Sequence, residues 1–69
     1  MFRFLIIVEK VNDNYSAYSP DIAGCVATGK TREEAEANMH EAIAFHIEGL
    51  KEDRLPIPEG KSSASCVLV

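Results

Sequence analysis

Residues 19–35 read SPDIAGCVATGKTREEA, and this stretch decides the fold because it combines a turn, a short strand and the start of a helix. Pro20 lacks the N–H group that a sheet ladder requires, so a strand should end before it. Gly24 and Gly29 bracket an apolar run and allow the backbone to bend on either side of it. The sequence therefore predicts a bend over residues 20–24 and a strand at CVATG, residues 25–29.

A capping box begins the helix that follows. The hydroxyl oxygen of Thr31 should accept the backbone N–H of Glu34, while the Glu34 carboxylate reaches back to the open end of the helix. Pro56 and Pro58 forbid continuation, so the helix should end near residues 51–53. Apolar side chains recur at helical spacing and predict a single stripe that packs on a sheet: Ala35, Met39, Ala42, Ile43, Ile47 and Leu50.

The segments on either side predict further strands. FRFLIIVEKV, residues 2–11, carries β-branched and aromatic residues on alternating faces, as strands do. NDN at 12–14 supplies turn residues, and YSAYS at 15–19 should return as the antiparallel partner. After a polar, proline-containing linker, ASCVLV at 64–69 reads as a fourth strand. The order is β-β-β-α-β, an α+β fold with one helix on a mainly antiparallel sheet.

The length of 69 residues predicts a single domain over residues 1–69. A core of this size buries only about 60% of the surface that the unfolded chain exposes. Self-association is a common way for a small scaffold to gain the missing burial. We therefore expect a dimer or a larger homo-oligomer.

The charge balance restricts the class of partner. The formal net charge is −4, with seven Lys and Arg against eleven Asp and Glu. An acidic chain lacks the basic footprint that binds phosphates, so no direct nucleic-acid binding is expected, whereas a basic protein partner suits it. The apolar run near the start is too short to cross a bilayer or to act as a signal peptide, so we expect no membrane partner and a cytoplasmic location.

No pattern in the sequence supports catalysis or a cofactor. Cys25 and Cys66 lack the CxxC spacing of a redox or zinc motif, and no base adjoins Cys25 in sequence to activate its thiol. His40 and His46 are six residues apart, which places them on well-separated faces of a helix and disfavours a shared zinc ion. GKT at 29–31 resembles the end of a phosphate-binding loop without its glycine spacing. We expect no enzymatic activity, no metal and no cofactor.

A nuclease site is disfavoured as well. Asp21 and Glu9 are two carboxylates, whereas RNase H-type chemistry clusters several acids around two metal ions. Asp21 is more simply explained as a turn residue after Pro20, where its side chain bonds nearby backbone N–H groups.

The order of the motifs resembles the HicB-like antitoxin family. An aromatic-containing strand is followed by SPDIAGC, TGKTREEAEAN, EAIAFHIEGL and PIP, and the resemblance extends over nearly the whole chain. It implies a partially degraded RNase H-like fold that lacks the catalytic acids, forms oligomers and neutralises a HicA-type toxin by direct contact. Such toxins are small, basic ribonucleases that cleave mRNA. Many family members also carry a C-terminal DNA-binding module, and because this sequence ends at Val69 we do not expect it to bind operator DNA alone.

Five residues are candidates for contact with the toxin. Asp21 and Ile22 lie in the bend, and Glu33, Glu36 and Glu41 lie on the acidic face of the helix. The alternative explanation of the glutamates is a helix face that is merely solvated. The alternative function is an oligomeric binding domain that has no toxin partner.

Overall fold

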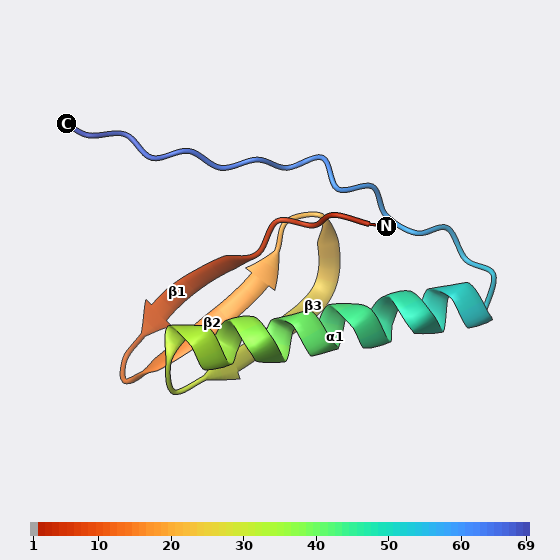
Figure 1. Ribbon diagram of the computed structural model, residues 1–69, viewed down its shortest axis with the longest axis horizontal. Coiled ribbons are helices and arrows are strands. Elements are labelled where there is room, and N and C mark those ends of the chain that lie inside the picture. Colours follow the sequence, from red (N-terminus) through yellow and green to blue (C-terminus); the bar gives the residue numbers. More distant parts are fainter. Residues whose placement is uncertain (1) are drawn as a thin grey trace.

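A computed structural model describes residues 2–69 and shows three antiparallel strands followed by one long helix (Figure 1). The strands are β1 (Ile7–Val11), β2 (Asn14–Ser19) and β3 (Ile22–Gly29), and they lie in the order β1-β2-β3. The helix α1 (Arg32–Glu52) follows β3 directly. The predicted α+β class is confirmed, and Met1 of the predicted domain lies outside the described residues.

The predicted hairpin between the first two strands is confirmed. Val8 lies opposite Ala17 and Val11 opposite Asn14, and Asn12 makes the turn with a φ of 56°, a left-handed conformation that asparagine tolerates. The first strand, however, begins at Ile7 and not at Phe2. Ile7 pairs with Tyr18 near the end of β2, and because β2 stops ahead of Pro20, residues 2–6 have no ladder partner.

The third strand begins three residues earlier than the sequence predicts. Ile22 already pairs with Ser19, and the next pair joins Val26 to Tyr18, so residues 23–25 form a bulge inside β3. Gly24 has a φ of 77°, which other residues adopt only with strain. The glycine therefore does bend the chain, but within the strand and not before it.

Helix α1 begins where the capping box predicts. The Glu34 backbone N–H donates to Thr31 Oγ1 over 3.0 Å, and the Glu34 carboxylate accepts the backbone N–H of Lys30 over 3.3 Å. The helix ends at Glu52, with Asp53 as its C-cap, within the predicted range. Its buried residues are Ala35, Met39 and Ile47, all members of the predicted stripe.

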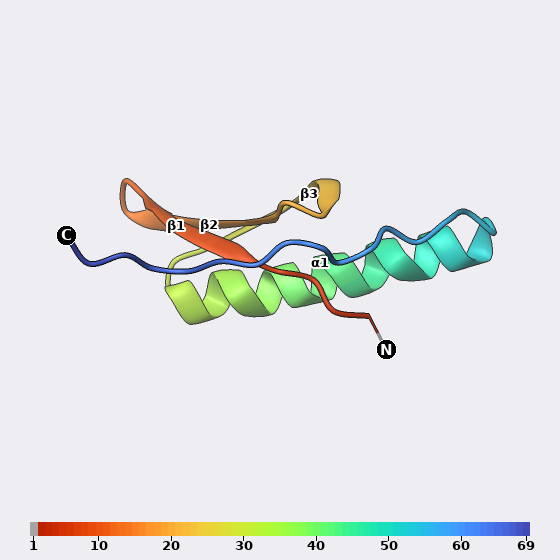
Figure 2. The ribbon, with the colours of Figure 1, turned by 90° about the horizontal axis from the view of Figure 1, so that it is seen from above.

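The core lies between α1 and one face of the sheet, and Figure 2 shows this two-layer arrangement from above. Its buried members come from two strands and the helix: Ala17, Ile22, Cys25, Ala35 and Met39. Small residues let the layers approach closely where the chain passes from β3 into α1. A Cβ atom added to Gly29 would lie only 2.5 Å from the backbone nitrogen of Ala35.

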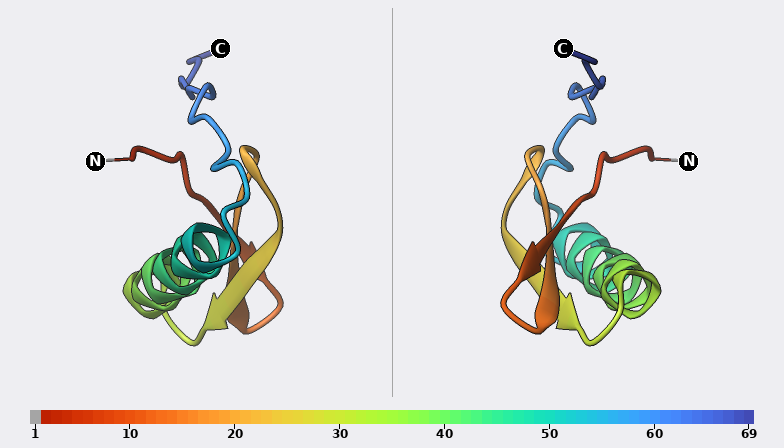
Figure 3. Two further views of the ribbon diagram at one scale, coloured as in Figure 1. Left: turned by 90° about the vertical axis from the view of Figure 1, so that its right-hand side faces the viewer. Right: turned by 90° about the vertical axis from the view of Figure 1, so that its left-hand side faces the viewer.

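The predicted fourth strand is wrong for this structure. Residues 64–69 are exposed and form no strand, and Figure 3 shows this end of the chain leaving the sheet and the helix. The prediction rested on β propensity, which reports how well side chains fit a pleated, half-buried surface and does not ensure a neighbouring strand. Residues 2–69 thus contain three paired strands and one extended C-terminal segment.

Candidate partner-binding surface

The exposed surface of helix α1 is acidic. Glu33, Glu36 and Glu41 are all exposed. At about 100° per residue, Glu41 lies on nearly the opposite side of α1 from the buried Met39. Residues 33–50 contain five glutamates and no lysine or arginine, so the surface has one sign of charge over most of the helix. We call this set of five glutamates the acidic face: Glu33, Glu34, Glu36, Glu41 and Glu48.

The two candidates in the bend have different environments. Ile22 is only 2% exposed and belongs to the core. Asp21 is half-buried, and its carboxylate accepts two hydrogen bonds from Ser62, one from Oγ over 2.8 Å and one from the backbone N–H over 3.3 Å. The structure therefore does not place Asp21 and Ile22 side by side on an open surface. Asp21 instead joins the bend to the C-terminal part of the chain.

The contacts at Asp21 also alter its acidity. The hydrogen bond from the Ser62 hydroxyl is the main cause that lowers the pKa of the Asp21 carboxyl below its ordinary value of 3.8, and the backbone groups of Ser62, Lys61 and Leu5 add to the effect. Asp21 is consequently a carboxylate at neutral pH. It holds residues 61 and 62 near Leu5, which leads into β1.

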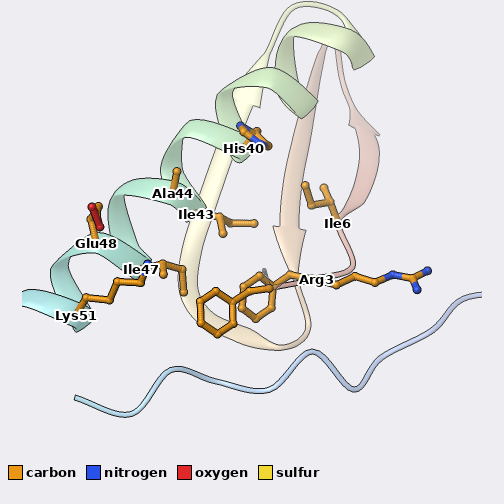
Figure 4. Close-up of a pocket in the computed structure, with 10 residues that line it drawn as sticks. Arg3, Ile6, His40, Ile43, Ala44, Ile47, Glu48 and Lys51 are labelled. Atoms are coloured by element: carbon orange, nitrogen blue, oxygen red, sulfur yellow. The ribbon is translucent and has the colours of Figure 1, made fainter. Parts of the chain in front are cut away.

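An apolar groove runs between the segment that precedes β1 and the second half of α1. Figure 4 shows Ile43 and Ile47 pointing from the helix toward Ile6 and the two phenylalanine rings. The rings of Phe2 and Phe4 are stacked, with 6.4 Å between their centroids. Lys51 Nζ lies 5.7 Å from the centroid of the Phe2 ring, a cation–π contact that ties the end of the helix to this segment.

Cys25 lies in the core, at the border of a second groove. Cys25 is 7% exposed and lines a second groove with His46 and Asp53. Among residues 2–69, no hydrogen bond joins Cys25 to His46, and no three His, Cys, Asp or Glu side chains gather closely enough to hold a metal ion. Cys25 packs in the core as a small apolar side chain.

Known proteins similar to this chain identify its family. A model of the family described as "HicB_like antitoxin of bacterial toxin-antitoxin system" matches residues 4–67. The chain belongs to the HicB-like antitoxin family. A solved chain from the HicA3 and HicB3 toxin–antitoxin complex is similar in fold, with a TM-score of 0.70 and 34% sequence identity, and the match covers 87% of this chain and 72% of that one.

Two relatives come from a phage and from a bacterium. An uncharacterized 14.9 kDa protein from the rep-hol intergenic region of Haemophilus phage HP1 is 50% identical over 54 residues, and the match spans 78% of this chain but only 41% of the phage protein. A UPF0150 protein of Helicobacter pylori is 39% identical over 57 residues, with 83% of this chain and 79% of the relative covered. The phage protein is thus more than twice as long as the part that this HicB-like chain matches.

Sequence reasoning located the acidic face but missed two features of the surface. The contact between Asp21 and Ser62 joins residues 41 positions apart, and no periodicity reports a contact over such a separation. Phe2 and Phe4 have the alternating pattern of a strand, and this pattern does not indicate that they line a groove with the helix. Among the described residues, no helix is both long and apolar enough to cross a bilayer.

Proposed function

We propose that this chain is an antitoxin that binds a small, basic HicA-type ribonuclease by direct contact and blocks the surface that cleaves mRNA. The observation that carries the proposal is the family match over residues 4–67. It is supported by the fold similarity to a chain from a toxin–antitoxin complex. In this role the protein acts in the cytoplasm as a single domain over residues 1–69, without catalysis, metal or cofactor.

The charge distribution supports a basic partner. The acidic face is exposed. It contains five of the eleven acidic residues of the chain, and no lysine or arginine lies between them in the helix. Opposite potentials raise the rate of encounter and select against partners of like charge. Glu33, Glu36 and Glu41 are the residues that we propose to contact the toxin.

The bend between β2 and β3 has a different part in this proposal. Asp21 remains a candidate contact because it is half-buried and keeps its negative charge at neutral pH. Ile22 lies in the core, so its contribution is to fix the backbone of the bend. Together they would add a negative group near the end of the sheet.

We also propose that the chain associates with itself and does not bind operator DNA alone. Among residues 2–69, only six hydrophobic residues are buried, which is a small core for a chain of this length: Ala17, Ile22, Cys25, Ala35, Met39 and Ile47. Association would add apolar burial. The net charge of −4 opposes binding to a phosphate backbone.

Co-expression with the product of the neighbouring gene tests the antitoxin function. If that gene encodes a small basic ribonuclease, the two proteins should co-purify and the growth arrest caused by the toxin should be relieved. The triple variant Glu33→Lys, Glu36→Lys and Glu41→Lys should lose rescue. A matched triple variant, Glu9→Lys, Asp13→Lys and Glu59→Lys, changes the net charge equally at exposed positions elsewhere and should retain it.

Two results would contradict the proposal. A neighbouring product that is not a small basic ribonuclease, together with failure to co-purify any such toxin, would favour the binding domain without a toxin partner. Equal loss of rescue in both triple variants would show that net charge, and not the acidic face, governs binding.

A further inference from the structure

The C-terminal segment, Ala64–Val69, has the composition of a strand but no strand beside it. It contains no charged residue and ends in three consecutive branched aliphatic residues. Val67 is 78% exposed and Leu68 is 100% exposed. Figures 1 and 3 show the segment extending away from the rest of the molecule. Such exposure is costly for branched aliphatic side chains, so the segment is suited to pairing with another surface.

The outer edge of β1 is open. β1 pairs with β2 on one side, and among residues 2–69 no strand pairs with the other side. An edge strand presents a row of unpaired N–H and C=O groups that can accept a further strand. The opposite edge, at β3, is less suitable because of the bulge at residues 23–25 and because the Asn38 side chain donates to the carbonyl of Thr28 over 2.8 Å.

Contacts ahead of the C-terminal segment set a register against β1. The backbone of Gly60 lies against the carbonyl of Arg3, where any Cβ atom would collide. Ser62 bonds to Asp21, whose carboxylate is also close to the backbone of Leu5. Residues 60 and 62 thus run beside residues 3 and 5. If both segments stay extended and advance two residues at a time, residues 64, 66 and 68 would lie beside residues 7, 9 and 11. These positions span the whole of β1.

The described chain nevertheless does not make this pairing with itself, because residues 64–69 leave the sheet edge after Ser62. We propose that the C-terminal segment of each chain pairs with the β1 edge of a second copy, in a reciprocal strand exchange. Exchange of identical elements is a low-cost route to a closed dimer, since the contacts are those a single chain would make. The segment has no charged side chain, so this pairing sets no like charges directly opposite each other.

This inference rests on the self-association proposed above and does not depend on the toxin. Cys66 provides a native reporter, because the register brings it beside Glu9, whose Cα atom would be within disulfide range on a neighbouring strand. The test uses the full chain carrying Cys25→Ser and Glu9→Cys, oxidised gently at micromolar concentration. The controls are Cys25→Ser alone, which reports pairing of Cys66 with its own copy, and Cys25→Ser with Glu41→Cys, which places a thiol on the far side of α1.

We expect the Glu9→Cys variant to form at least tenfold more covalent dimer than either control, with peptide mapping that joins position 9 to Cys66. A disulfide within one chain would overturn the exchange and show that the segment pairs with its own β1. A yield of dimer no higher than in the controls would also overturn it.

Light scattering separates the exchange from self-association in general. The variant that stops after Ser63 loses only exposed residues, and circular dichroism confirms that it folds. We expect it to be a monomer at concentrations where the full chain is a dimer, and Leu68→Asp should weaken the dimer in the same direction. If the truncated chain remains a dimer, the exchange is wrong but self-association stands. If the full chain is a monomer at high micromolar concentration, both the exchange and self-association are wrong.

Discussion

At the scale of single residues, two glycines offer opposite tests of the packing. Gly29 has the Ala35 backbone nitrogen 2.5 Å from the position of an added Cβ, whereas an added Cβ at Gly49 meets nothing within 4 Å. Gly29→Ala should lower the free energy of unfolding by about 1–3 kcal/mol, the usual cost of overpacking. Gly49→Ala should raise it by about 0.5–1 kcal/mol, because alanine suits the interior of a helix better than glycine. Chemical denaturation measures both, and equal effects of the two variants would contradict the close approach of β3 and α1.

Asp21 gives a second test at this scale. Its pKa is lower in the folded chain than its ordinary value of 3.8, so the contact with Ser62 stabilises the folded form above that pH. As the pH falls through the lower, folded pKa, the carboxylate is protonated and the contact is lost. An NMR titration should show Ser62→Ala raising the Asp21 pKa toward 3.8, while Ser63→Ala leaves it unchanged. An unchanged pKa in Ser62→Ala would mean that this hydroxyl does not hold the carboxylate.

At the scale of the elements, the N-terminus of α1 depends on one hydroxyl group. Thr31→Ala removes the acceptor of the Glu34 N–H and should reduce the free energy of unfolding by about 0.5–2 kcal/mol. Thr31→Ser keeps the oxygen, so its free energy of unfolding should stay within a few tenths of a kcal/mol of the wild-type value. Thermal denaturation followed by circular dichroism compares them. A loss as large in Thr31→Ser as in Thr31→Ala would show that the methyl group, and not the cap, stabilises this turn.

The elements differ in how far local sequence determines them. The helix and the hairpin were predicted because their signals are local: a cap at Thr31, a stripe of period 3.6 and turn residues at 12–14. The limits of β1 and the fate of residues 64–69 depend on whether another strand lies alongside. Pairing is a long-range property, and Pro20 affects the start of β1 only because the start of β1 lies beside the end of β2. Propensity gives the tendency to be extended but not the neighbour.

At the scale of the whole molecule, the sequence predicts that the helix surface is negatively charged. It does not predict which distant segments of the chain contact each other. The acidic face follows from helical spacing, since an exposed side is what remains once Met39 and its neighbours are buried. The sequence predicts Ile22 as a contact residue in the bend, whereas its side chain fills the core. The contact between Asp21 and Ser62 could not be predicted, because it depends on the path that the chain takes around the sheet between these two residues.

The net charge leads to a prediction about how this chain binds the basic toxin that we propose as its partner. If the acidic face steers a basic partner, the association rate constant should fall at least about tenfold as the salt concentration rises from 0.05 M to 0.5 M, because salt screens charges that are not yet in contact. The dissociation rate should change less. Stopped-flow measurements on the wild-type chain and on the variant with lysines at positions 33, 36 and 41 separate the two rates.

The variant should associate slowly at low salt and lose most of the salt dependence, while the matched variant at positions 9, 13 and 59 should keep a steeper dependence. If the association rate constant of the wild-type chain does not depend on salt concentration, apolar contacts and not charges would drive recognition. The groove at Phe2 and Phe4 would then be the surface to mutate.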